Sequence, residues 1–168
     1  MGQRGEAERI TRFEDVAALI RQYTPADWLD GGVGTAEIDG CEEGLGVRLP
    51  DSYRWFLCEF GIGCFPQEIY GIHHGPLPGF KVECHAQGER HQCEPPMPHH
   101  LIPFSPDGWG NHYCLDTSRL SDGECPVVFW NHAGGEDQQP EQTHSTFLDW
   151  LEENAREIAE EEQRELRE

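Results

Sequence analysis

The chain has 168 residues and carries 32 acidic against 12 basic side chains, a formal net charge of −20. A field of this sign repels nucleic acids and anionic membrane surfaces, which are bound through basic patches, and it attracts basic proteins. The first ten residues contain no apolar stretch typical of a secretory signal, and no apolar run approaches the roughly 18 residues that a membrane span requires. We therefore expect a cytoplasmic protein without a nucleic-acid or membrane partner. On composition alone, the simpler explanation that acidity keeps the protein soluble is favoured.

A chain of this length forms one domain and buries roughly 70% of its unfolded surface, so it needs no metal or disulfide to fold. Five Trp, eight Phe and four Tyr supply a core. The seven cysteines are odd in number and scattered, which does not fit a disulfide framework. We expect reduced thiols and no cofactor.

The first predicted element is a helix near the N-terminus. Its apolar stripe falls at i, i+3, i+4 and i+7 and consists of Phe13, Val16, Ala17 and Ile20. Thr11 is predicted to cap this helix, with Glu14 completing a capping box. The glycine-rich run at 31–34 lacks the Lys-Ser/Thr pair of a phosphate-binding loop, so it is predicted to be an ordinary loop.

The clearest element is a helix that follows Pro50, after a short helical segment around Ile38 to Leu45. Its apolar residues repeat the same spacing and are Tyr53, Phe56, Leu57 and Phe60. Asp51 or Ser52 is expected to cap it, and Gly61 to end it in the left-handed conformation. The stripe is expected to belong to the core.

After residue 61 the pattern changes from helix to strand. Four short runs have β-type patterns, at 68–72, 101–105, 112–116 and 126–132. The last of these is almost entirely apolar and is predicted to lie centrally in a sheet. Residues 107–110 have the composition of a turn that joins two strands, and such short connections imply antiparallel pairing.

The chain ends in a predicted helix. Ser145 or Thr146 is expected to cap it, and Phe147, Trp150 and Leu151 to face inward. Residues 152–168 hold eight Glu against three Arg, which is typical of a solvated helix that projects or frays. The sequence therefore predicts an α+β domain over residues 10–151, with a twisted, mainly antiparallel sheet flanked by helices, and an acidic helical extension over 152–168.

Several of these segments, taken in order, resemble one family. The segments are Leu45-Gly-Val-Arg-Leu-Pro50, the helix of Tyr53 to Gly61, Ile69-Tyr-Gly71, Leu101-Ile-Pro-Phe104, Asp107-Gly-Trp-Gly-Asn111, Tyr113-Cys-Leu-Asp116, Pro126-Val-Val-Phe-Trp130 and a closing helix from Ser145 to Leu151. By these motifs the chain is identified as a member of the SUKH superfamily, in the branch of fungal cell-wall-synthesis regulators and bacterial toxin-immunity proteins.

The resemblance implies a mixed sheet wrapped by helices, without a catalytic centre. It also implies a non-enzymatic immunity protein that binds and neutralises a cognate toxin. A nuclease toxin carries a basic groove for phosphates, which an acidic inhibitor would match. The alternative is a cytosolic regulatory module for protein interactions, similar to the fungal relatives. A zinc-binding or thiol enzyme is the minor alternative.

The segment from His73 to His100 is richer in His and Cys than the family leads us to expect. Both are ligands that zinc prefers, but the segment contains no Cys-x2-Cys or His-x3-His pair. We expect a surface insertion without metal. Residue types alone would also allow a Cys–His nucleophile, yet Cys58 in a helix and Cys114 in a strand are expected to behave as small hydrophobic side chains. We assign no catalytic or metal-binding residue.

The candidate partner-binding residues are Asp107, Trp109, Asn111 and Asp116, which are expected to cluster around the predicted hairpin. An exposed Trp flanked by carboxylates would dock against a basic toxin, because tryptophan is enriched among interface hot spots. The simpler explanation is that Asp and Gly serve the turn while Trp109 packs over the sheet edge. The sequence leaves both explanations open.

Overall fold

The computed structural model describes residues 2–26, 29, 31–75 and 78–167. In these residues the helices are α1 (Gly2–Tyr23), α2 (Thr35–Leu45), α3 (Asp51–Glu59), α4 (Val82–His91) and α5 (Phe147–Glu165). The strands are β1 (Gly63–Cys64), β2 (Glu68–Ile69), β3 (Leu101–Pro106), β4 (His112–Asp116), β5 (Val127–Trp130) and β6 (Glu141–His144). The α+β class and the antiparallel pairing are confirmed. No described helix combines the length and apolar character needed to cross a bilayer.

The main sheet has the strand order β3-β4-β5-β6, and every neighbouring pair is antiparallel. The prediction that 126–132 contains a central strand is confirmed, because β5 lies between β4 and β6. β6 was not predicted. Its sequence, Glu-Gln-Thr-His, is almost entirely exposed and has no apolar alternation to reveal a strand. β1 and β2 form a separate two-stranded sheet, and β2 covers only the first part of the predicted run 68–72.

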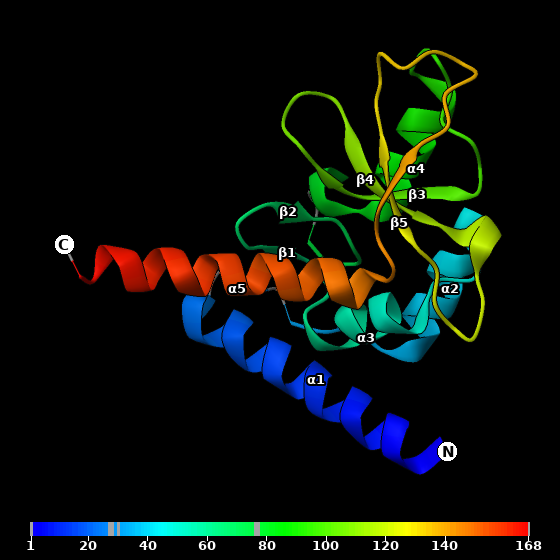
Figure 1. The fold of residues 1–168 in the computed structure, drawn as a ribbon. Helices are drawn as coiled ribbons and strands as arrows, with labels where there is room; N and C mark the ends of the chain where they lie inside the picture. The colour runs from blue at the N-terminus through cyan, green and yellow to red at the C-terminus, as the bar shows by residue number, and fades with distance from the viewer. Residues whose placement is uncertain (1, 27–28, 30, 76–77, 168) are drawn as a thin grey trace.

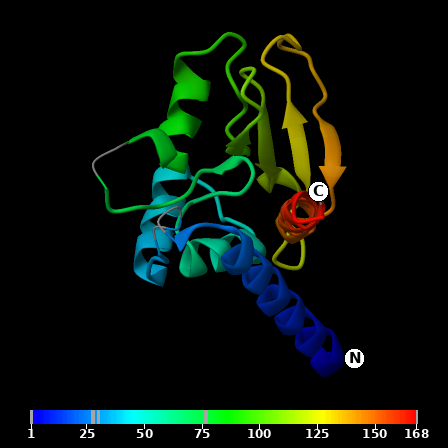
Figure 2. The ribbon, with the colours of Figure 1, turned by 90° about the vertical axis from the view of Figure 1, so that its left-hand side faces the viewer.

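In Figures 1 and 2, α5 runs below this sheet and α4 lies to one side of it. On the α5 side, the ring of Phe104 in β3 lies 4.9 Å from that of Trp150. The other face carries a second, smaller core made of Met97, Leu101, Cys114, Val128 and Trp130. Successive side chains of a strand point to opposite faces, so each inner strand contributes to both cores.

The predicted aromatic stripe of α3 is confirmed as core. Tyr53, Phe56 and Leu57 are completely buried, and the Tyr53 hydroxyl donates a hydrogen bond of 2.6 Å to the carbonyl of Tyr70. The buried phenol therefore keeps a partner, which avoids the cost of an unpaired polar group. Gly61 follows the helix with φ 72°, the left-handed conformation that was expected.

Two of the predicted helix caps are wrong. Thr11 lies in the middle of α1, which already begins at Gly2. In α3 the capping position is Pro50, without a side-chain hydrogen bond. Ser52 is instead committed elsewhere, since its hydroxyl donates to Glu124 at 2.6 Å. The third prediction is confirmed: Thr146 caps α5 by accepting from the backbone N–H of Asp149 at 3.1 Å.

The prediction of a mere surface insertion between His73 and His100 is wrong, because this segment contains α4. Val82, Ala86 and Arg90 form the buried face of that helix. The guanidinium of Arg90 donates to the carbonyls of Leu45 (3.3 Å) and His99 (2.7 Å). A face with only two apolar residues and one arginine does not produce a recognisable helical stripe.

The closing helix runs through residue 152 without a break. Phe147, Trp150 and Leu151 are buried as predicted, and so are Ala155 and Ala159 further along. Residues 160–167 are all exposed, in agreement with the expected solvated end. The division into a domain over 10–151 and an extension over 152–168 stays a prediction.

Gly71 follows β2 and lies against the end of α3, where there is no room for a side chain. An added Cβ would lie 1.9 Å from the carbonyl oxygen of Gly61 and 2.8 Å from a methyl group of Leu57. We expect Gly71→Ala to lower the free energy of unfolding by about 2 kcal/mol or more, measured by urea denaturation. Gly40→Ala is the control. Gly40 lies in α2, and a Cβ added there would have no neighbouring atom within 4 Å, so the substitution should be neutral or stabilising.

Candidate partner-binding surface at the β3–β4 hairpin

The turn between β3 and β4 is organised by one carboxylate. Asp107 Oδ1 accepts hydrogen bonds from the backbone N–H groups of Trp109 (2.7 Å) and Asn111 (3.0 Å), and Oδ2 accepts from the Asn111 amide at 2.6 Å. Burial opposes ionisation of Asp107, but these hydrogen bonds outweigh it and lower its pKa. The carboxylate is therefore ionised at neutral pH and holds the turn in one conformation.

Asn111 extends this order to the neighbouring β5–β6 loop. Its Oδ1 accepts from the backbone N–H of His132 at 3.1 Å and lies 2.9 Å from Nδ1 of the same residue. Within that loop, Gln138 exchanges hydrogen bonds with the backbone N–H and C=O of Asn131 at 3.2 and 2.9 Å. The hairpin tip and the β5–β6 loop are thus joined into one surface.

Trp109 stands at this tip with 82% of its surface exposed. The explanation that it packs over the sheet edge is therefore wrong, while the turn role of Asp107 and its neighbours is confirmed. Among the described residues, only Leu166 is a comparably exposed large apolar side chain. A rigid backbone that carries an exposed indole reduces the entropy lost on binding, so the tip has the properties of an interface anchor.

Asp116 does not belong to this cluster, contrary to the sequence-based expectation. It lies at the opposite end of β4, where it is only 8% exposed. Its carboxylate accepts hydrogen bonds from the Ser118 hydroxyl (2.6 Å) and the Arg119 guanidinium (2.7 Å). A polar pocket of about 410 Å³ adjoins it, lined also by Gln142. Residue spacing alone placed Asp116 near the turn, but the strand separates the two ends.

Within the described residues, we assign no site to the thiol-enzyme or zinc-binding alternative. No group of three or more His, Cys, Asp or Glu among these residues is arranged to hold a metal ion. Cys114 is buried in the sheet, and burial raises its pKa far above that of an ordinary thiol. Cys58 is exposed on α3, so the expectation that it acts as a small core residue is wrong.

A polar pair of the buried His112 and the partly buried Glu89 joins α4 to the sheet on the side of the second core. Nε2 of His112 lies 3.1 Å from Oε1 of Glu89, and the buried Nδ1 has no hydrogen-bond partner among the described residues. Burial, reinforced by the charge of His85, lowers the pKa of His112 from 6.5 to about 4. His112 is therefore neutral at physiological pH.

This shift makes stability depend on pH. Between about pH 6.5 and pH 4 the unfolded chain takes up a proton at His112 while the folded chain does not, so the free energy of unfolding falls as the pH falls. The loss amounts to at most about 3 kcal/mol, because a difference of one in pKa between the folded and unfolded chain corresponds to about 1.4 kcal/mol. Burial raises the pKa of Glu89, which changes stability in the opposite direction and reduces the loss. We expect urea midpoints of His112→Gln to fall less over this range than those of the wild type. Parallel pH profiles would contradict this assignment.

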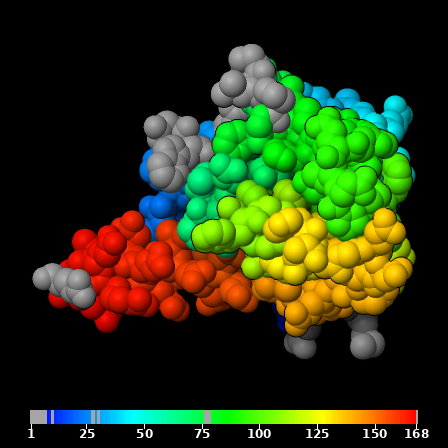
Figure 3. Space-filling model, turned by 90° about the horizontal axis from the view of Figure 1, so that it is seen from above, coloured from blue at the N-terminus to red at the C-terminus, as the bar shows by residue number. Residues whose placement is uncertain are grey.

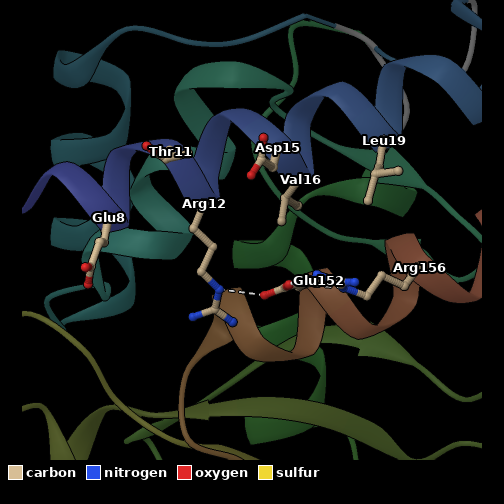
Figure 4. Close-up of a pocket in the computed structure, with 8 residues that line it drawn as sticks. All are labelled: Glu8, Thr11, Arg12, Asp15, Val16, Leu19, Glu152 and Arg156. Atoms are coloured by element: carbon tan, nitrogen blue, oxygen red, sulfur yellow. Dashed lines mark hydrogen bonds and ion pairs between the residues drawn. The ribbon is translucent and has the colours of Figure 1, made fainter. Parts of the chain in front are cut away.

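A groove of about 360 Å³ separates α1 from α5 (Figure 4), and Glu152 in its wall pairs with both Arg12 and Arg156. Arg12 donates to Glu152 at 2.5 Å and to Asp149 at 2.7 Å, and Arg156 donates to Glu152 at 2.6 Å. These pairs hold α1 against α5.

Removing the organising carboxylate is expected to loosen the hairpin tip. In Asp107→Ala the backbone N–H groups of Trp109 and Asn111 lose their acceptor, so their hydrogen exchange should accelerate about tenfold or more. The variant Asp107→Asn keeps one acceptor oxygen, so its exchange rates should lie between those of the wild type and Asp107→Ala. Unchanged exchange at Trp109 in the alanine variant would show that the turn does not depend on Asp107.

A comparison with protein families agrees with this architecture. The family model SUKH_5, described as SMI1-KNR4 cell-wall, matches residues 14–156. The match runs from the middle of α1 to the middle of α5 and includes the hairpin, the segment containing α4 and the polar strand β6. The motifs from Leu45 to Leu151 and this match agree, and the chain belongs to the SUKH superfamily.

Proposed function

We propose that this chain is a non-enzymatic immunity protein that binds and neutralises a cognate protein toxin. The family accommodates immunity proteins and SMI1-KNR4-like regulators, and its membership alone does not choose between them. The observation that carries the proposal is the exposed Trp109 on a turn held by Asp107 and Asn111. A rigid, solvent-exposed indole is typical of a side chain that another protein covers on binding.

The charge of the chain indicates the class of partner. At −20, the protein attracts a basic surface and speeds the encounter with it, by roughly 10- to 1000-fold at low salt. Nucleases carry such surfaces because they bind phosphates. We therefore propose a nuclease as the toxin, inhibited by an acidic protein that covers its substrate groove. Of the sequence-based candidates, Asp107, Trp109 and Asn111 form the proposed contact, while Asp116 lies too far along β4 to join them.

Co-expression tests this function in cells. The toxin encoded beside this gene is expressed with and without the protein, and the complex is then purified through a tag on the toxin. We expect the protein to restore growth and to co-purify with the toxin. Continued killing, with no protein recovered on the tagged toxin, would refute the proposal.

The family description favours a second function, that of a regulatory module for interactions between cytosolic proteins. This function predicts a gene neighbourhood without a toxin and several stable partners. The identity of the adjacent gene and the number of proteins bound at stoichiometric amounts therefore distinguish the two functions.

A further inference from the structure

Two aromatic rings lie half-buried on the face of the sheet that α5 covers only in part. Tyr113 in β4 and Phe129 in β5 are cross-strand partners, and their ring centroids are 5.3 Å apart in an edge-on arrangement. Tyr113 also reaches Trp150 of α5, at 5.7 Å between ring centroids. Phe129 belongs to neither of the two buried cores. This part of the sheet face therefore offers aromatic surface that the described residues leave only partly covered.

Carboxylates surround this pair of rings. Glu141 of β6 is the register partner of Phe129. On α5, Glu153 and Glu157 follow Trp150 by three and seven residues, so the same helix face brings them next to Tyr113. Besides burial, the charges of Asp107, Glu153 and Glu157 raise the pKa of Tyr113, which agrees with this placement. Seen from above, the yellow-green hairpin lies beside the orange-red α5 (Figure 3).

These carboxylates have no Arg or Lys partner within the described part of the chain. Glu141, Glu153 and Glu157 form no ion pair with Arg or Lys there, and Glu153 contacts only the imidazole of His144, at 3.0 Å. The side of the same helix that faces α1 differs, since Glu152 pairs with both Arg12 and Arg156. The negative charge beside the two rings is therefore available to a cation from outside.

We infer that this aromatic–acidic face, formed by Tyr113, Phe129, Glu141, Glu153 and Glu157, binds arginine side chains of a basic partner protein. A planar guanidinium stacks on an aromatic face while its N–H groups donate to carboxylates, and it is more weakly hydrated than a lysine ammonium. The inference rests on the proposed function and deepens it, because it names the face that the toxin's basic surface covers and the residue type that it presents.

Arginine and lysine peptides test the chemistry of this face. An oligoarginine peptide and an oligolysine peptide of equal length are titrated into the full-length protein by calorimetry, at low and at high salt. We expect the arginine peptide to bind about fivefold more tightly or better, and Phe129→Leu to lower its affinity about three- to tenfold while changing lysine binding less than about twofold. Equal affinities for the two peptides, or an unchanged affinity in Phe129→Leu, would overturn the inference.

A charge variant keeps the test independent of any effect on folding. The double variant Glu153→Gln/Glu157→Gln changes two exposed side chains and should weaken both peptides about fivefold or more at low salt. The control Glu14→Gln/Glu43→Gln removes the same charge from exposed positions on α1 and α2, and should change each affinity less than about twofold. If both double variants weaken binding equally, only the net charge matters and the face is not a site.

The same variants separate this inference from the proposed function. If the wild type rescues cells from the toxin and Phe129→Leu and Glu153→Gln/Glu157→Gln rescue equally well, with unchanged affinity for the purified toxin, the toxin binds elsewhere and the inference fails alone. If the wild type itself does not rescue, the proposed function fails. The peptide titrations then still decide whether the face prefers arginine.

Discussion

Replacing Phe147 by alanine is expected to lower the free energy of unfolding by about 3–5 kcal/mol. Phe147 begins α5 and is completely buried. Its ring contacts four others, with centroid distances to the rings of Tyr53 (5.0 Å), Phe56 (5.5 Å), Phe104 (5.1 Å) and Trp150 (6.1 Å). These rings come from α3, β3 and α5, so the cavity would open where the helices meet the sheet.

Urea or thermal denaturation measures this effect, and Phe147→Leu is the matched control. Leucine keeps most of the apolar volume and loses the edge-on aromatic contacts, so it should cost markedly less than alanine. A loss below about 1 kcal/mol in Phe147→Ala would contradict the arrangement, because a cavity of that size at a fully packed junction cannot close without cost.

The second large effect is on binding. Trp109→Ala is expected to weaken the complex with the cognate toxin by about 2 kcal/mol or more, which is roughly a 30-fold increase in Kd. The stability of the free protein should hardly change, because 82% of the Trp109 surface is already in contact with solvent. The combination of intact folding and lost affinity marks an interface residue.

Leu166 provides the control for this prediction. It is 84% exposed, near the end of α5, and Leu166→Ala removes a similarly exposed apolar side chain from a different part of the molecule. Surface plasmon resonance with both variants should give a weaker complex for Trp109→Ala alone. If both variants bind like the wild type, the hairpin tip does not contact the toxin.

The parts of the fold that were predicted from the sequence share one property. The aromatic stripe from Tyr53 to Phe60 and the apolar run of β5 have a periodicity that the surroundings do not override. The elements that were missed lack it. α4 has Arg90 at a buried position, and β6 is polar because it forms the outer strand of the sheet. Arg90 is explained only by the carbonyls of Leu45 and His99, which the folded chain brings to it.

The candidate site divides in the same way. The grouping of Asp107, Trp109 and Asn111 in one turn could be predicted because the turn is local and its hydrogen bonds span at most four residues, while their role in binding stays a prediction. Asp116 was grouped with them wrongly, since a strand carries it to the other end of the sheet. The pairing of Tyr113 with Phe129 depends on strand register, and the approach of Glu153 depends on how α5 crosses the sheet. Neither can be deduced from residue spacing.

Titrating the purified toxin with this protein tests the central proposal most directly. Nuclease activity of the toxin is measured on a nucleic-acid substrate while the protein is added at concentrations well above the Kd. If the chain is an immunity protein for a nuclease, activity should fall linearly and vanish near equimolar protein, and Trp109→Ala should require a large excess. Full activity at a large excess of wild-type protein, with no complex detected by size-exclusion chromatography, would contradict the proposal.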